Sequence, residues 1–193
     1  MITPKDILDF WLVEAGEKAW YDGAHLDAKI AVRFEPVWRA ARVGKLDHWL
    51  ATPAEALALL ILVDQFPRNM FRGTALSFAS DPAALRVAKQ AIKLGHDLKT
   101  KPPERQFFYL PLMHSEFQAD QDQCLRMFLL NLPDAEHLLH ARAHRAQIRD
   151  LGRFPSRNAA LGRVSNEAEL AFLAAGGYPA LVKKMRTELI PAM

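Results

Sequence analysis

Apolar residues recur every three or four positions along most of the chain, which is the spacing of one face of an α-helix. Ile7, Leu8, Trp11 and Leu12 form such a face near the N-terminus, and residues 118–132 repeat the pattern. We find no segment with the two-residue alternation that is typical of a half-buried strand. The pattern therefore predicts an all-α protein of about eight to ten helices joined by short turns.

The most apolar stretch covers residues 56–63 and follows Thr52-Pro53-Ala54-Glu55, a capping box that starts a helix. A helix that is apolar on every side is expected to be buried at the centre of the fold. Asp64 and Gln65 come next, and we expect them on the last turn of this helix. A buried carboxylate there requires a partner, and Arg68 is the nearest cation in the sequence.

The chain has 193 residues, half of them hydrophobic, and no linker or break in composition, so we expect one domain over residues 1–193. The only cysteine, Cys124, rules out an internal disulfide and fits a reducing compartment. The N-terminus lacks the pattern of a signal peptide, and the apolar run 56–63 is far shorter than the ~20 residues of a membrane span. We therefore expect a cytoplasmic protein with no membrane partner.

Two segments share the order Phe-Pro-Arg-Asn: residues 66–69, and residues 154–158, where a serine is inserted. We predict that these segments and the turn His114-Ser115-Glu116 line one polar pocket. The predicted site residues are the polar side chains of these segments and of positions beside them: Asp64, Gln65, Arg68, Asn69, His114, Glu116, His144, Arg153, Arg157 and Asn158.

Three hypotheses follow from this set. The first is a binding module that presents the pocket to a peptide or a small anionic molecule, because arginine holds carboxylate and phosphate groups in a bidentate way. The alternative is an enzyme, a hydrolase or lyase acting on an anionic substrate, with His114 and Glu116 as acid and base and with Arg68 and Arg157 as anion clamps. The third is a structural or regulatory partner of other proteins. If the set binds no ligand, the same polar groups would pair with one another and cap helix ends.

His137, His140 and His144 lie on one face of a predicted helix, at a spacing that would let two imidazoles hold a metal ion. However, the sequence contains no His-Glu-x-x-His motif. It also lacks a phosphate-binding glycine loop, a dinucleotide fingerprint and a Gly-x-Ser-x-Gly motif. We therefore predict no metal site and no cofactor.

The net charge of +3 is too small to indicate a nucleic-acid partner by itself. A row of arginines at positions 142, 145, 149 and 153 would suit phosphate contacts, but no aromatic residues are interleaved with it. A solvated helix face with some arginines turned to the pocket is the favoured interpretation, and nucleic acid is disfavoured as a partner.

Four motifs stand out along the chain: Asp64-Gln65-Phe66-Pro67-Arg68-Asn69, His114-Ser115-Glu116, His144-Arg145 and Gly152-Arg153-Phe154-Pro155. In these motifs the chain resembles the bacterial "domain of unknown function 924" family. The resemblance implies a tetratricopeptide-like α-α superhelix of antiparallel helix hairpins, and it implies no particular activity. Ser156 stands where we expect the family to carry a histidine, so a catalytic role of that histidine would be absent here.

Overall fold

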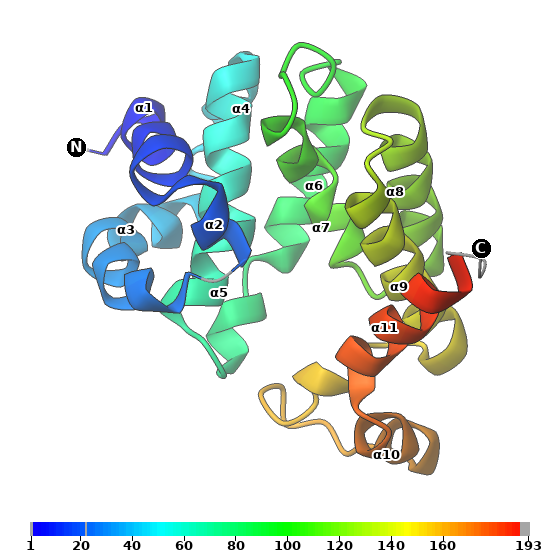
Figure 1. The fold of residues 1–193 in the computed structure, drawn as a ribbon. Helices are drawn as coiled ribbons and strands as arrows, with labels where there is room; N and C mark the ends of the chain where they lie inside the picture. Colours follow the sequence, from blue (N-terminus) through cyan, green and yellow to red (C-terminus); the bar gives the residue numbers. More distant parts are fainter. Residues whose placement is uncertain (1, 22, 190–193) are drawn as a thin grey trace. The chain divides into compact units, whose positions relative to one another are not determined.

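The computed structural model describes residues 2–21 and 23–189, and this part of the chain is helical with no strand (Figure 1). The predicted all-α class is confirmed, while the tetratricopeptide-like stack of hairpins stays a prediction. The chain divides into two compact units, Met1–Pro111 and Leu112–Met193, which we call the N-terminal and C-terminal units. That the two form one domain also stays a prediction.

The helices of the N-terminal unit are α1 (Pro4–Leu8), α2 (Gly16–Tyr21), α3 (Asp27–Arg42), α4 (Pro53–Leu60), α5 (Phe66–Met70) and α6 (Asp81–Lys93). Two π-helical segments and four short 3₁₀ segments complete it: η1 (Asp9–Ala15) and η4 (Ile61–Gln65), then η2 (Ala24–Leu26), η3 (Asp47–Ala51), η5 (Ala75–Phe78) and η6 (Glu104–Phe108). The short helix α7 (Leu110–Met113) contains the boundary between the units. The C-terminal unit continues with α8 (Gln118–Asn131), α9 (Ala135–Leu151), η7 (Pro155–Arg157), α10 (Glu167–Ala174) and α11 (Gly177–Leu189).

The side chains of Thr3 and Thr52 cap α1 and α4, accepting hydrogen bonds from backbone N–H groups of the first turns. The Thr52 cap is the one that the sequence predicts. The start of α10 is capped by Asn166. The Asn166 side chain accepts from the N–H of Glu169 at 2.9 Å, and the Glu169 carboxylate accepts from the N–H of Asn166 at 2.9 Å. This reciprocal pair satisfies two donors that would otherwise have no partner.

The apolar run 56–63 is buried, as its composition predicts. The helix does not end at Asp64 and Gln65, however. It continues from α4 through η4 and α5 as far as Met70. The predicted position of the two residues on a last helical turn is therefore wrong, because the extra residue of the π-helical segment lets the chain run on past Pro67.

Pro67 has no N–H, so the turn before it has one backbone donor fewer, and the carbonyl of Val63 in that turn takes a hydrogen bond from a side chain. Ser80 donates to this carbonyl, with its Oγ 2.6 Å away, and the Nε1–H of Trp38 donates to Ser80 at 2.9 Å. Ser80 and Trp38 are fully buried. This chain of bonds ties α3 and the start of α6 to the helix that carries Asp64.

Phe66 lies at the centre of the aromatic core of the N-terminal unit. Its ring centroid is 4.7 Å from that of Phe34, 5.5 Å from that of Trp11 and 5.9 Å from that of Phe10.

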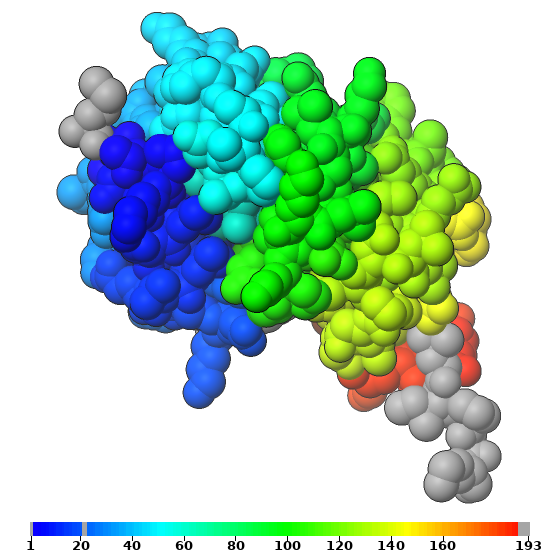
Figure 2. Space-filling model, turned by 90° about the horizontal axis from the view of Figure 1, so that it is seen from above, coloured from blue at the N-terminus to red at the C-terminus, as the bar shows by residue number. Residues whose placement is uncertain are grey.

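On the face seen in Figure 2, the green segment around residue 100 lies beside the cyan segment of α4. No helix in the described ranges is both long enough and apolar enough to cross a bilayer.

In the C-terminal unit, α8 packs against α9, and α11 packs along another side of α9. The core between α9 and α11 consists of Leu139, Ala143 and Val182. Tyr178 at the start of α11 meets His144 late in α9, and Arg186 near the end of α11 pairs with Glu136 early in α9. The two helices are therefore antiparallel, which brings the start of α11 close to the segment that follows α9.

Replacing Ser80 with alanine should lower the free energy of unfolding of the N-terminal unit by roughly 1–3 kcal/mol, because the Val63 carbonyl and the Trp38 N–H would both lose their partner in a buried place. Urea denaturation followed by tryptophan fluorescence measures this change. The exposed Ser156→Ala is the matched control and should change stability by less than about 0.5 kcal/mol. Equal effects of the two substitutions would contradict the role of Ser80.

Candidate functional site

Asp64, Gln65 and Arg68 of the predicted set lie in the N-terminal unit and contact one another. Asp64 is 1% exposed, accepts a hydrogen bond from the Gln65 amide, and lies 3.8 Å from Arg68 Nη2. The same Arg68 nitrogen lies closer to Asp81, at 2.7 Å from Oδ1. Arg68 also donates to the carbonyl of Ser77. The predicted ion pair between Asp64 and Arg68 is present, but Arg68 binds Asp81 more closely.

Asn69, the fourth predicted residue of this unit, joins α5 to the segment before α3. Its buried amide donates to the carbonyl of Gly23 at 3.2 Å and to Oδ1 of Asp27 at 2.9 Å. A Cβ on Gly23 would lie 2.5 Å from the carbonyl oxygen of Ala19 and 3.2 Å from the Asn69 amide, so only glycine fits. Arg72 binds Asp27 in a bidentate way, and its hydrogen bonds lower the pKa of the Asp27 carboxyl.

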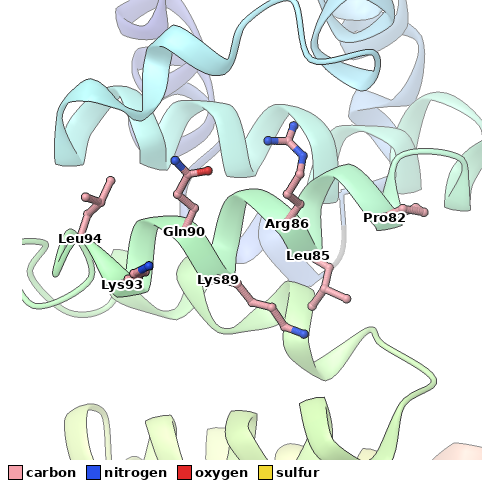
Figure 3. Close-up of a pocket in the computed structure, with 7 residues that line it drawn as sticks. All are labelled: Pro82, Leu85, Arg86, Lys89, Gln90, Lys93 and Leu94. Atoms are coloured by element: carbon pink, nitrogen blue, oxygen red, sulfur yellow. The ribbon is translucent and has the colours of Figure 1, made fainter.

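Among the hollows on the surface of the N-terminal unit, two differ in their relation to the predicted residues. One contains Asn69 and Arg72, and its lining also includes Asp27, Ala28, Ala31, Met70, Phe71, Thr74, Ala75 and Leu76. The other lies along α6 and contains none of the predicted residues (Figure 3). Its lining is formed by Pro82, Leu85, Arg86, Lys89, Gln90, Lys93 and Leu94.

The remaining six predicted residues lie in the C-terminal unit, and Glu116 fastens the turn after α7 to the segment after α9. Its carboxylate accepts from the backbone N–H of Phe154 at 2.8 Å and from two nitrogens of Arg163 at 2.7 and 3.0 Å. Burial opposes ionisation of Glu116, but these donors outweigh burial, so the pKa of the carboxyl lies below its ordinary value. Both oxygens are thus held by groups of the same unit.

A second buried carboxylate, Glu169, anchors α10. It is fully buried, whereas Leu170 and Leu173 of the same helix are exposed. Arg153 binds Glu169 through two nitrogens, and the amide of Asn158 donates to it at 3.2 Å. These hydrogen bonds, with Arg153 contributing most, hold the pKa of Glu169 at about 2. Arg153 and Asn158 are therefore brought together, as predicted, but around a carboxylate of the chain itself.

Arg157 and Phe154 lie beside the predicted histidines His114 and His144. The Arg157 guanidinium lies 4.4 Å from the centre of the Phe154 ring and donates to the carbonyl of His114 at 3.0 Å. Phe154 in turn meets the ring of His144, with centroids 5.5 Å apart. The second Phe-Pro segment thus lies against the predicted histidines. Whether the first Phe-Pro segment shares a pocket with it stays a prediction.

We define the histidine site as His114, His140, His144 and Tyr178. The hydroxyl of Tyr178 lies 2.6 Å from Nδ1 of His140 and 3.0 Å from Nδ1 of His144. Nδ1 of His144 also lies 2.9 Å from the carbonyl oxygen of His140. The rings of His114 and His144 are 6.5 Å apart between centroids. Side chains from α9 and α11, together with the turn after α7, therefore meet in one cluster.

The electrostatics of this cluster keep His144 neutral. Burial lowers its pKa to about 3, and the nearby His114, His140 and Arg157 also disfavour its charged form. Burial likewise lowers the pKa of His140 and raises that of the Tyr178 hydroxyl. At neutral pH the imidazoles of His140 and His144 are therefore uncharged.

Sequence reasoning missed Tyr178, because it joins His144 from 34 positions away and no local pattern marks it. The three histidines predicted on one face of α9 have different neighbours. His140 and His144 face Tyr178, whereas His137 stacks on Phe128 with ring centroids 5.4 Å apart. In the described part of the chain, no three side chains of the metal-ligating types are grouped to hold an ion.

The ionisation of Glu169 should make stability depend on pH in acid. Its folded pKa of about 2 lies below the ordinary 4.5, so its charge stabilises the fold above pH 4.5, and this contribution is lost as the pH falls toward 2. Urea denaturation between pH 4.5 and 2 should show a smaller loss of stability in Glu169→Gln than in the wild type. Glu167→Gln, exposed on the same helix, should follow the wild type. Parallel curves for all three proteins would contradict the assignment.

Residues 7–177 match the family model described as "Bacterial protein of unknown function (DUF924)". A solved structure, titled "Structure of Protein of Unknown Function ATU0120 from Agrobacterium tumefaciens", is 40% identical to the chain with a TM-score of 0.83. The match covers 88% of this chain and 96% of that one. No curated protein matches the sequence. The extent of the family match and the identity to the solved structure show that the chain belongs to the DUF924 family of bacterial proteins.

Proposed function

We propose that the protein is a binding module whose C-terminal unit holds a peptide segment or a small polar molecule at the histidine site. The observation that carries this proposal is the state of His144. Its Nδ1 is engaged by the His140 carbonyl and by Tyr178, while its Nε2 has no hydrogen-bonding partner among the described residues. A neutral imidazole held in this way offers a fixed acceptor to a ligand.

The same observation argues against His144 as a general base. A general base works best when its pKa lies near the operating pH. With a pKa of about 3, roughly one His144 in ten thousand is protonated at pH 7, so the group is a weak proton acceptor. Glu116, the other member of the enzyme hypothesis besides His114, already has both oxygens occupied. Binding is therefore the better supported function, and acid–base catalysis through His114 is the second candidate.

Arg157 supports a ligand that also carries an anionic group, because its positive charge lies close enough to His144 to lower the pKa of that imidazole. Arg153 and Arg163 are less suited to bind an anionic group of a ligand, since each already binds a carboxylate of the chain.

We also propose a cytoplasmic location. The single cysteine, Cys124, is buried, as is common for a thiol kept in a reducing compartment.

A thermal-shift screen of the full chain tests the binding function, with trialanine, citrate and inorganic phosphate as the first probes. A probe at about 100 times its dissociation constant should stabilise the protein by roughly 2.7 kcal/mol. His144→Asn should abolish the shift, because asparagine keeps a donor for the His140 carbonyl but has no atom at the Nε2 position. The exposed His25→Asn should retain it. A shift that survives in His144→Asn, or no shift with any peptide or anion, would overturn the proposal.

A further inference from the structure

The hollow along α6 belongs to the N-terminal unit, whereas the histidine site belongs to the C-terminal unit. Its lining comes from α6 and from Leu94, the residue that follows the last turn of this helix. The buried side chains of α6 are different ones: Ala84, Val87, Ala88 and Ala91. The helix packs against α4 and against the segments η3, η4 and η6. The hollow therefore marks the face of α6 that the core of its unit does not use.

The side chains that line the hollow form two rows with a spacing of four residues. The rows are Leu85, Lys89 and Lys93, and Pro82, Arg86, Gln90 and Leu94. In Figure 3, Arg86 and Gln90 point to one side of the helix, and Leu85 and Lys89 point to the other. Rows of this spacing are the ridges of an α-helix, and a ridge of a second helix packs into the groove between two of them. The hollow has the form of such a groove, about 18 Å long from residue 82 to residue 94.

The charge of this groove has one sign. Arg86, Lys89 and Lys93 are exposed, and none of the described residues that line the groove is acidic. Arg86 binds Asp47 at 2.8 Å, so a part of its charge is met within the unit. Residues 82–101 hold five cationic side chains and one acidic one, which gives a net charge of +4, whereas the whole chain carries +3. The positive charge of the protein is therefore concentrated in this segment.

The single acid of that segment does not reach the surface. Asp97 is 2% exposed and accepts a hydrogen bond from the Tyr109 hydroxyl at 2.8 Å. The surface that this segment presents to solvent is therefore positive, and a partner with acidic side chains complements it.

Apolar side chains lie beside the cations, so the groove is more than a charged surface. Leu94 is 49% exposed, and Leu85 is half-buried one turn before Lys89. Covering these leucines removes apolar surface from water, which favours association. An anionic membrane would also attract the cations, but a helix that binds a membrane buries its own broad apolar face there. The apolar face of α6 is packed inside its unit, so a protein partner fits this groove better than a bilayer.

We infer that the groove on α6 is a docking site for an acidic helix of a partner protein. An apolar ridge of that helix packs between the two rows, and glutamate or aspartate side chains beside the ridge pair with Lys89 and Lys93. The site lies in a different unit from the histidine site. The inference therefore does not depend on the binding function proposed above.

NMR on the full chain labelled with ¹⁵N tests the site with a designed helical peptide of alanine, leucine and glutamate. The peptide has leucine at every fourth position and glutamate on both sides of it, and its control has lysine in place of each glutamate. The acidic peptide should shift the backbone amide signals of residues 82–94, and added salt should weaken the binding, because salt screens exposed charges. The lysine peptide should leave these signals in place.

Lys93→Glu should weaken binding of the acidic peptide roughly tenfold, because it replaces an attraction by a repulsion at the groove. Lys18→Glu, exposed on α2, makes the same change in net charge and should weaken the binding by less than about twofold. Equal effects of the two substitutions, or equal binding of the lysine peptide, would overturn the inference. So would the absence of binding at about 1 mM acidic peptide. Binding of phosphatidylserine vesicles that is lost in Lys93→Glu, without binding of the peptide, would assign the groove to a membrane surface instead.

Discussion

The buried carboxylate of Glu169 is the constraint on which the C-terminal unit depends. A charge removed from water is tolerated only when it is paired and hydrogen-bonded, and Glu169 receives donors from Arg153, Asn158 and the backbone of Asn166. These partners come from the segment after α9 and from the start of α10. Satisfying one carboxylate thus fixes the path of the segment between the two helices.

That path places the histidine site. Glu116 binds the backbone N–H of Phe154 and, through Arg163, the carbonyl of the same residue, so Phe154 is held from two sides. Phe154 then lies against His144 and under the guanidinium of Arg157. Glu116, predicted as an acid or base, and Arg153, predicted to line the pocket, therefore both bind groups of the chain itself.

The two Phe-Pro-Arg-Asn segments use the same local chemistry in different units. In each, the asparagine is buried and hydrogen-bonded, and the arginine lies over a phenylalanine ring. Proline removes a backbone donor in each case, and in the first segment Ser80 supplies the replacement. The two segments therefore share a buried asparagine and an arginine that packs on a phenylalanine ring.

The sequence predicted the helical class because capping residues and the apolar period act locally, and it placed the buried run 56–63 correctly. It failed at residue 65, where a π-helical segment carries the helix past a proline that propensity reads as a stop. It singled out His114 and His144 as candidates through the resemblance to a family, but it did not single out Tyr178. Tyr178 is brought to His144 only by the packing of α11 on α9, which no local pattern encodes.

We propose that His144 acts as a neutral, fixed hydrogen-bond acceptor and not as an acid–base catalyst. A pH titration of its imidazole signals by NMR tests this most directly. The account predicts that His144 stays uncharged from pH 8 down to about pH 4 and takes up a proton only near its pKa of about 3. Protonation near pH 6.5, the ordinary range of a histidine, would contradict the account and would restore the acid–base hypothesis.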